Sequence, residues 1–102
     1  MVVKFRGEPM PFDVIYHPDV KKIDLPKLDA RSKTMIKRAI EERLSSRPEL
    51  FGRPLRGSLK GYWKLRVGGY RIVFKLVGDK ILVLAIVDRK TVYLQSERRI
   101  EK

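Results

Sequence analysis

The sequence predicts an α+β domain: a small, mainly antiparallel four-stranded sheet with two N-terminal helices on one face and a basic, concave face opposite. Three observations lead to this fold class. A hairpin pattern runs over 61–76, a continuous apolar strand pattern follows at 81–87, and helical periodicity is confined to the first half of the chain. Helices segregated from strands in this way cover one face of an antiparallel sheet. We expect residues 1–102 to form one domain.

The first half of the chain is expected to supply one strand and both helices. Residues 1–11, with their glycine and prolines, form a loose leader, and a strand follows over 12–16. Pro18 suits the first turn of a short helix, because its φ is already fixed at a helical value. Asp29 can cap a second helix over 30–46. The seam of that helix at helical spacing comprises Ser32, Ile36, Ala39, Ile40, Arg43 and Leu44.

The hairpin is predicted by Gly68-Gly69, which lies between two runs of aromatic and β-branched residues and favours a two-residue turn. This turn places Arg66 directly opposite Arg71, and successive side chains then alternate between the two faces. The apolar face comprises Trp63, Leu65, Ile72, Phe74 and Leu76. The basic face comprises Lys64, Arg66, Arg71 and Lys75. Two arginines that face each other across a ladder repel, so we infer that something outside the fold uses this positive charge.

The next turn decides which side chains of the strand over 81–87 enter the core. A three-residue turn over 78–80 gives the fuller core and places Arg89 on the basic face, so it is the turn we expect. It buries Leu82, Leu84 and Ile86. A two-residue turn would instead bury Ile81, Val83, Ala85 and Val87. Residues 94–102 are expected to form a polar tail.

The charge distribution indicates a polyanionic partner. The net charge is +12, and residues 52–78 contain seven basic residues and no acidic one. These basic residues are Arg53, Arg56, Lys60, Lys64, Arg66, Arg71 and Lys75, and Tyr62, Trp63 and Tyr70 are interleaved with them. Such a field favours nucleic acid, the ribosome, an acidic protein or an anionic membrane surface.

Composition excludes several other classes of protein. No apolar run approaches the roughly 20 residues that span a bilayer, and no signal peptide is recognisable, so we expect a cytoplasmic protein. The absence of cysteine and the single histidine exclude disulfides and argue against a zinc site. That histidine, His17, is the obvious catalytic candidate, but it lies where a strand meets a helix, and capping or solvation is the commoner role there. No P-loop, magnesium-binding carboxylate pair or nucleophilic triad stands out. We therefore expect no cofactor and no metal.

The chemistry that remains open is cleavage of a phosphodiester without a metal. RNA carries its own nucleophile, the 2′-hydroxyl, so an enzyme need only orient it, accept its proton and stabilise charge on the phosphorus centre. Guanidinium groups bind phosphate oxygens directly. Lys64 can accept the proton, because the neighbouring Arg66 and Arg71 favour a neutral amine. Tyr62 or Tyr93 can orient the nucleophile or stack on a base. Plain nucleic-acid binding by the same surface is the alternative.

Four stretches of the sequence form an ordered pattern. They read Tyr16-His-Pro-Asp-Val-Lys-Lys22, Pro54-Leu-Arg-Gly57, Gly61-Tyr-Trp-Lys-Leu-Arg-Val-Gly-Gly-Tyr-Arg-Ile-Val-Phe74 and Asp88-Arg-Lys-Thr-Val-Tyr93. In this order and spacing they resemble the RelE/ParE toxin superfamily, and its RelE branch best. The resemblance runs from about Phe12 to Tyr93, which is nearly the whole chain.

The resemblance implies a toxin of a type II toxin–antitoxin system that acts as a ribosome-dependent endoribonuclease. RelE-type toxins cleave mRNA in the ribosomal A site, without a metal, by attack of the 2′-hydroxyl on the scissile phosphate. By motif, Lys64 matches a lysine proposed as base or charge stabiliser, and Arg71 matches the arginine that contacts the scissile phosphate. Arg89 matches an arginine proposed as acid or phosphate ligand, and Tyr93 matches the tyrosine that stacks on or orients the substrate. The substrate-binding residues expected beside them are Arg66, Tyr62, Lys60, Arg56 and Lys75.

Partners and alternatives follow from the same resemblance. A cognate antitoxin is expected to form a hetero-oligomer with the toxin, by masking the basic face or displacing a helix, and the other partners are the ribosome and mRNA. Tyr62 stands where the best-known RelE pattern has a further lysine, which leaves the identity of the general base open. The ParE branch shares the fold but poisons DNA gyrase, so a ParE-like gyrase inhibitor is one alternative. A non-catalytic RNA-binding module is the other.

Overall fold

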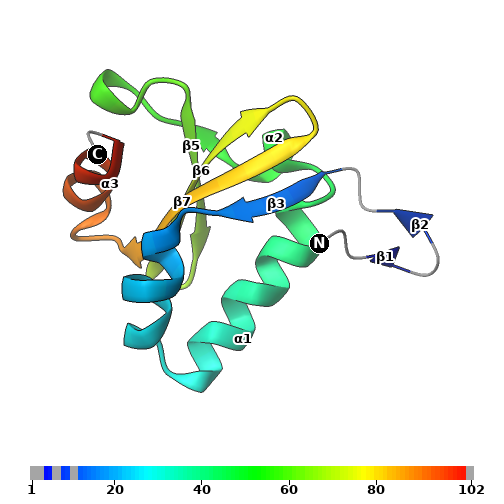
Figure 1. Cartoon of the computed structure of the whole chain (residues 1–102), viewed down its shortest axis with the longest axis horizontal. Coiled ribbons are helices and arrows are strands. Elements are labelled where there is room, and N and C mark those ends of the chain that lie inside the picture. The colour runs from blue at the N-terminus through cyan, green and yellow to red at the C-terminus, as the bar shows by residue number, and fades with distance from the viewer. Residues whose placement is uncertain (1–3, 6–7, 10–11, 101–102) are drawn as a thin grey trace.

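The computed structural model describes residues 4–5, 8–9 and 12–100 of the chain (Figure 1). Two short strands, β1 (Lys4–Phe5) and β2 (Glu8–Pro9), pair with each other in an antiparallel arrangement. They fall within the leader expected over 1–11, and the rest of that leader lies outside the described residues.

A five-stranded sheet forms the centre of the fold, in the order β3-β7-β6-β5-β4. Its strands are β3 (Asp13–Tyr16), β4 (Arg53–Pro54), β5 (Tyr62–Val67), β6 (Tyr70–Val77) and β7 (Lys80–Asp88). Neighbouring strands are antiparallel, except that β3 runs parallel to β7. The α+β fold class is confirmed. The sheet has one strand more than expected, because part of the loop after the second helix pairs with the edge of β5 as β4.

The β5–β6 hairpin has the predicted register. Arg66 pairs with Arg71, and Trp63 pairs with Phe74 in a stacked contact whose ring centroids are 6.4 Å apart. The two-residue turn begins at Gly68, whose φ of 58° suits glycine and few other residues. Local sequence therefore determines this element, because the turn and the strands favour the same pairing.

The turn between β6 and β7 is shorter than expected. Val77 pairs with Lys80, so the turn has only two residues, Gly78 and Asp79. Gly78 adopts a φ of 61°, which such a tight turn requires. The prediction of a three-residue turn is therefore wrong, and β7 begins with the opposite alternation of faces.

A β-bulge reverses that alternation halfway along β7. Phe74 pairs with Val83, whereas the preceding Val73 pairs with Ala85, so Leu84 is the extra residue. After the bulge, the side chains of β7 lie on the faces that a three-residue turn would have given them. The core beneath the N-terminal helices consequently contains Ile81, Val83 and Ile86 from this strand, rather than the expected Leu82, Leu84 and Ile86.

Two helical stretches follow β3. The first comprises the π-helical turn η1 (Val20–Asp24) and the 3₁₀ turn η2 (Leu25–Lys27), and the second comprises α1 (Ala30–Ala39) and the π-helical turn η3 (Ile40–Leu44). His17 caps the first stretch, since its Nδ1 accepts a hydrogen bond from the backbone N–H of Asp19 at 3.1 Å. Two shorter turns are α2 (Pro48–Phe51) and η4 (Gly57–Leu59). None of the helices described is long and apolar enough to cross a membrane.

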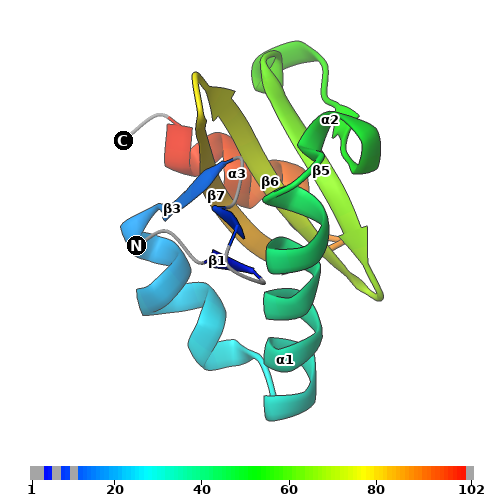
Figure 2. The same cartoon turned by 90° about the vertical axis from the view of Figure 1, so that its right-hand side faces the viewer.

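The N-terminal helices cover one face of the sheet, as predicted (Figure 2). The apolar seam of α1 and η3 packs on side chains of β5, β6 and β7, and η1 adds Val20. The fully buried side chains of this layer include Val20, Ile36, Leu44, Ile72, Phe74, Ile81 and Val83.

The N-terminus of α1 is capped as predicted. The carboxylate of Asp29 accepts a hydrogen bond from the backbone N–H of Ser32 at 2.7 Å, and this bond lowers the pKa of Asp29. We expect Asp29→Ala to lower the melting temperature at pH 7 by roughly 2–6 °C. A lowered pKa means that the ionised cap stabilises the fold above the ordinary value of 3.8 and that the stabilisation is lost as the pH falls below it. Thermal melts of both proteins from pH 2 to pH 7 should therefore converge at acid pH; an equal difference at every pH would contradict this account.

A C-terminal helix, α3 (Val92–Ile100), lies on the opposite side of the sheet from α1 (Figure 2). Residues 94–100 of the expected polar tail belong to this helix. Its apolar side chains pack in a second cluster, whose buried members are Leu55, Leu59, Val73, Leu84, Ala85 and Val92. The face away from the N-terminal helices is therefore partly covered and partly apolar, and the basic residues occupy only a portion of it.

Candidate nucleic-acid interface

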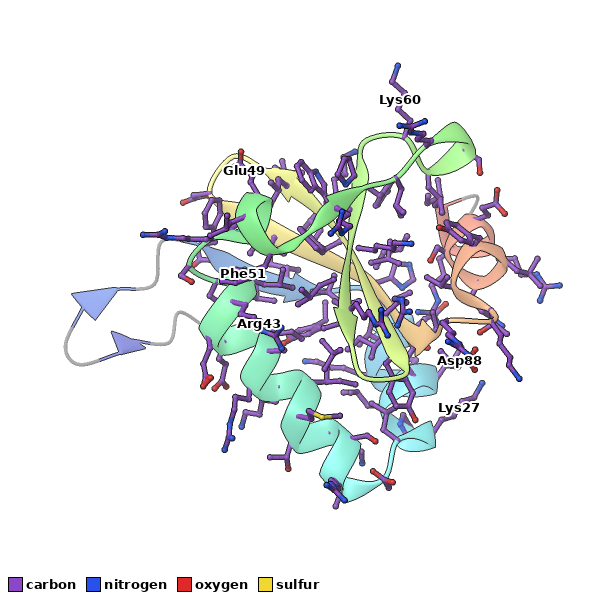
Figure 3. The ribbon with its side chains drawn as sticks, turned by 180° about the vertical axis from the view of Figure 1, so that it is seen from behind. Lys27, Arg43, Glu49, Phe51, Lys60 and Asp88 are labelled. Carbon is purple, nitrogen blue, oxygen red and sulfur yellow. The ribbon has the colours of Figure 1, made fainter. Side chains whose placement is uncertain are left out.

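A basic groove crosses the β5 edge of the sheet. Its cavity volume is about 330 Å³, and none of the described residues that line it carries a carboxylate. The side chains that line this groove are Arg43, Phe51, Arg53, Lys64, Leu65, Arg66 and Arg71. Figure 3 shows Arg43 and Phe51 close together, on η3 and α2. Five cationic side chains from two layers of the fold thus converge on one space.

Lys64 connects this groove with α3. Its ammonium Nζ donates a hydrogen bond to the Tyr93 hydroxyl at 3.1 Å and lies 5.5 Å from the centroid of the Tyr93 ring. Tyr93 is 49% exposed, so its ring and hydroxyl remain available to a ligand. The start of α3 is held by Asp88, whose Oδ1 accepts hydrogen bonds from the backbone N–H groups of Lys90 and Thr91 at 2.8 and 3.1 Å. The sheet and α3 therefore present an ammonium and a phenol together.

The two facing arginines resolve their repulsion in different ways. Arg71 is half-buried, and its Nη1 donates hydrogen bonds to the backbone carbonyls of Tyr70 at 2.9 Å and Gly68 at 3.3 Å. Arg66 is exposed. Carbonyl oxygens compensate only part of a guanidinium's charge, so a bound anion would be stabilised by both side chains.

The remaining predicted site residues lie around this groove rather than in it. Arg89 is exposed beside the hairpin turn, where its backbone N–H donates to the carbonyl of Gly69 at 3.2 Å. After the β7 bulge, Val87 pairs with Arg71. Arg89, two residues further on, therefore has the alternation that was predicted for the basic face. Tyr62 and Lys75 pair across β5 and β6, two residues along β5 from Lys64. The Lys75 Nζ lies 5.5 Å from the centroid of the Tyr62 ring.

Two of the predicted site residues, in the loop before β5, lie apart from the groove. Arg56 and Lys60 flank η4, and both are exposed. Neither lines the groove. Figure 3 shows Lys60 pointing into solvent, away from the rest of the molecule. The structure thus brings together Lys64, Arg66, Arg71 and Tyr93, and leaves these two apart.

Besides the buried Leu65, three residues of the groove were not predicted as site residues. Arg43 interrupts the apolar seam of its helix, and a charged side chain among apolar neighbours was the available signal. Arg53 belongs to the basic run, but its pairing with Lys64 depends on a strand of only two residues. Phe51 is apolar, and apolar side chains usually lie in the core, whereas Phe51 is 41% exposed. Across residues 12–100, no group of three or more acidic, histidine or cysteine side chains is arranged to hold a metal ion.

Residues 14–93 match the family described as ParE toxin of type II toxin-antitoxin system, parDE. The chain belongs to this toxin family. The family lies within the RelE/ParE superfamily, so the predicted superfamily is confirmed, and the chain is the toxin of a type II toxin–antitoxin system. No curated protein sequence matches this toxin significantly.

Solved structures similar to the toxin include several RelE proteins. The RelBE2 toxin–antitoxin complex from Mycobacterium tuberculosis matches with 27% identity and a TM-score of 0.72, over 78% of this chain and 99% of that one. A double arginine-to-alanine mutant of Escherichia coli RelE in the free state matches with 26% identity and a TM-score of 0.66, over 89% and 99%. The RelB–RelE complex from Methanococcus jannaschii matches with 28% identity and a TM-score of 0.63, over 78% and 94%.

Proposed function

We propose that this toxin is a metal-independent, ribosome-dependent endoribonuclease that cleaves mRNA by attack of a 2′-hydroxyl on the scissile phosphate. The observation that carries the proposal is the contact between Lys64 and Tyr93 at a groove whose described lining residues include arginines and no carboxylate. Ammonium, guanidinium and phenol groups placed together can bind a phosphodiester and stabilise charge on it. The identities of 26–28% with RelE proteins support the RelE branch.

In the proposed reaction the toxin orients the RNA and stabilises charge. Lys64 accepts the proton of the 2′-hydroxyl or stabilises its oxyanion, and Tyr93 stacks on or orients the nucleotide. The 2′-oxygen forms a bond to phosphorus, the bond from phosphorus to the 5′-oxygen breaks, and that oxygen takes up a proton. Arg71 binds the phosphate oxygens, exchanging its carbonyl partners for the anion. Arg89, beside the hairpin turn, serves as proton donor or second phosphate ligand.

The pair of Tyr62 and Lys75 addresses the departure from the RelE pattern. A lysine of that pattern is replaced by Tyr62, but Lys75 pairs directly across from it and places an ammonium 5.5 Å from the Tyr62 ring. A ring and an ammonium at this distance attract each other. We infer that Lys75 supplies a positive charge in the region that the missing lysine leaves.

The proposed partners are a cognate antitoxin, the ribosome and mRNA, in the cytoplasm. Two of the similar structures are toxin–antitoxin complexes. The net charge of +12 favours an acidic or amphipathic antitoxin segment and attracts ribosomal RNA.

The second candidate function is inhibition of DNA gyrase. One observation favours it: the family whose model matches residues 14–93 is named for ParE. A gyrase inhibitor does not need side chains that bind a scissile phosphate and transfer a proton. The contact between Lys64 and Tyr93 is for that reason the feature that ranks the nuclease first.

Inducible expression followed by primer extension on cellular mRNA tests the proposal. We expect cuts inside translated codons, and we expect Arg71→Ala and Arg89→Ala each to reduce them by about 10²–10³-fold, because each removes a donor to a developing negative charge. Arg31→Ala, on the exposed surface of α1, is the matched control and should cut normally. Intact mRNA with growth arrest and inhibited supercoiling would establish the gyrase alternative. Intact mRNA with normal growth would favour a non-catalytic RNA-binding module.

A further inference from the structure

We propose that the part of the groove formed by Arg43, Phe51 and Arg53 is a subsite for one further nucleotide of single-stranded RNA, next to the nucleotides that react. The base stacks on Phe51, and its phosphate is bound by the two guanidinium groups. This inference rests on the proposed endoribonuclease function and adds three residues to it.

The first argument is the convergence of charge. Arg43 comes from η3 and Arg53 from β4, and they line the same groove as Lys64. Arg53 pairs directly with Lys64 across the β4–β5 ladder. Like charges on facing strand positions destabilise a sheet, and no carboxylate among the described lining residues neutralises them. A phosphate group would neutralise this cluster.

The second argument is the exposed aromatic ring. Phe51 is 41% exposed and belongs to neither buried cluster, although it lies on a chain segment pressed against the core. Gly52 makes that close approach possible: a Cβ at this position would lie 2.6 Å from Cζ of Phe74 and 2.9 Å from the carbonyl oxygen of Pro48. The tight packing fixes the backbone between Phe51 and Arg53. An exposed ring beside guanidinium groups is a platform for base stacking.

The third argument is size and continuity. The cavity volume of about 330 Å³ lies at the lower end of small-molecule sites, which suits one nucleotide. Lys64 lines the groove and also contacts Tyr93, so a strand bound at Tyr93 can continue into this subsite. An acidic peptide would satisfy the charges equally well, but a flat ring with adjacent guanidinium groups favours a base with its phosphate.

Binding of RNA that cannot be cleaved tests the subsite. The probe is a fluorescein-labelled RNA hexamer with 2′-O-methyl groups throughout, titrated by fluorescence anisotropy at several salt concentrations. We expect Phe51→Ala to weaken binding by about 5- to 150-fold, and Phe51→Trp to retain it, because stacking on a ring supplies that much. Arg43→Gln and Arg53→Gln should each reduce the slope of log affinity against log salt by about 0.7.

The controls are exposed residues outside the subsite. Leu50→Ala, one residue earlier in α2 and 65% exposed, should bind like the wild type, as should Arg38→Gln on the exposed face of α1. Thermal melts show that each variant is folded. Unchanged affinity and salt slope in the groove variants would overturn the subsite. The same titration is made with polyglutamate. If Phe51→Ala weakens the binding of polyglutamate as strongly as the binding of RNA, the subsite is overturned in favour of a site for an acidic protein segment.

The same variants separate the subsite from the proposed chemistry. If the wild type cleaves mRNA but the groove variants bind the hexamer normally, the subsite is wrong and the endoribonuclease stands. If the groove variants lose affinity while the wild type cleaves no mRNA, the subsite stands as an RNA-binding site and the chemistry is wrong.

Discussion

Arg99→Met should lower the free energy of unfolding by about 3–5 kcal/mol, because it leaves a buried carboxylate without its partner. Arg99 is 5% exposed and Asp24 is 3% exposed. The guanidinium Nη1 and Nη2 donate to the two carboxylate oxygens of Asp24, each at 2.6 Å, and this bond raises the pKa of Arg99. Asp19 lies 3.7 Å from the Nε of the same guanidinium.

This ion pair also completes the edge of β7 beyond the end of β3. Asp24 accepts a hydrogen bond from the backbone N–H of Ile86 at 2.8 Å, and Arg99 donates to the carbonyl of Leu84 at 3.0 Å. The carbonyl belongs to the bulge residue Leu84, and the N–H lies two residues further along β7. Loss of Arg99 therefore removes the anchor of α3, takes a donor from the carbonyl of Leu84 and leaves the charge of Asp24 without its guanidinium partner.

Urea denaturation monitored by the fluorescence of Trp63 measures the effect. Arg98→Met is the control, since Arg98 is the neighbouring residue of α3 and is exposed, and it should change the free energy of unfolding by less than about 0.5 kcal/mol. Asp24→Leu combined with Arg99→Met should recover part of the loss, because no charge then remains buried without a partner. A single Arg99→Met variant as stable as Arg98→Met would show that the pair contributes no net stability.

The fold is predictable from sequence where neighbours along the chain decide it. The β5–β6 register follows from Gly68-Gly69 and the residues beside it, and the cap at Asp29 lies within three residues of its partner. Helix α3 is different. Its polar composition resembles a tail, and its anchor is a contact between Arg99 and Asp24, which are 75 residues apart. No local pattern contains that contact.

The error in β7 has a similar origin. The prediction of a three-residue turn before β7 assumes that side chains alternate regularly along the whole strand. It selects the alternation that buries the larger side chains. The bulge at Leu84 breaks that assumption, because the strand buries side chains on both faces once α3 covers the second one. A continuous apolar run is compatible with either alternation of side chains. The packing of α3 on the second face distinguishes the two alternations.

The candidate site divides in the same way. Lys64, Arg66 and Arg71 share a hairpin face, so alternation alone groups them. The association of Tyr93 with Lys64 was implied by the family resemblance, and the two residues are 29 positions apart. Arg43 and Arg53 reach the groove from separate elements. Their contribution follows from how η3 and β4 pack at the β5 edge, which the spacing of residues does not encode.

Lys64→Met is expected to reduce the rate of mRNA cleavage by about 10²–10⁴-fold, the range typical for loss of a group that transfers a proton in the transition state. Methionine keeps the unbranched stem as far as Cε and removes the ammonium that contacts both the hydroxyl and the ring of Tyr93. Single-turnover cleavage on programmed ribosomes measures the chemical step apart from binding. Lys60→Met, exposed and outside the groove, is the control and should cleave at the wild-type rate.

Tyr93→Phe separates the two contacts of that ammonium. The variant keeps the ring, and with it the stacking surface and the attraction of the Lys64 Nζ at 5.5 Å, but loses the hydroxyl that accepts the hydrogen bond at 3.1 Å. If the hydroxyl orients Lys64 for proton transfer, the single-turnover rate falls in Tyr93→Phe while the affinity for RNA stays at the wild-type value. If the ring alone matters, Tyr93→Phe cleaves normally and Tyr93→Ala loses affinity. Wild-type rates in both Lys64→Met and Tyr93→Phe would exclude this pair from the chemistry and leave it to Arg71 and Arg89.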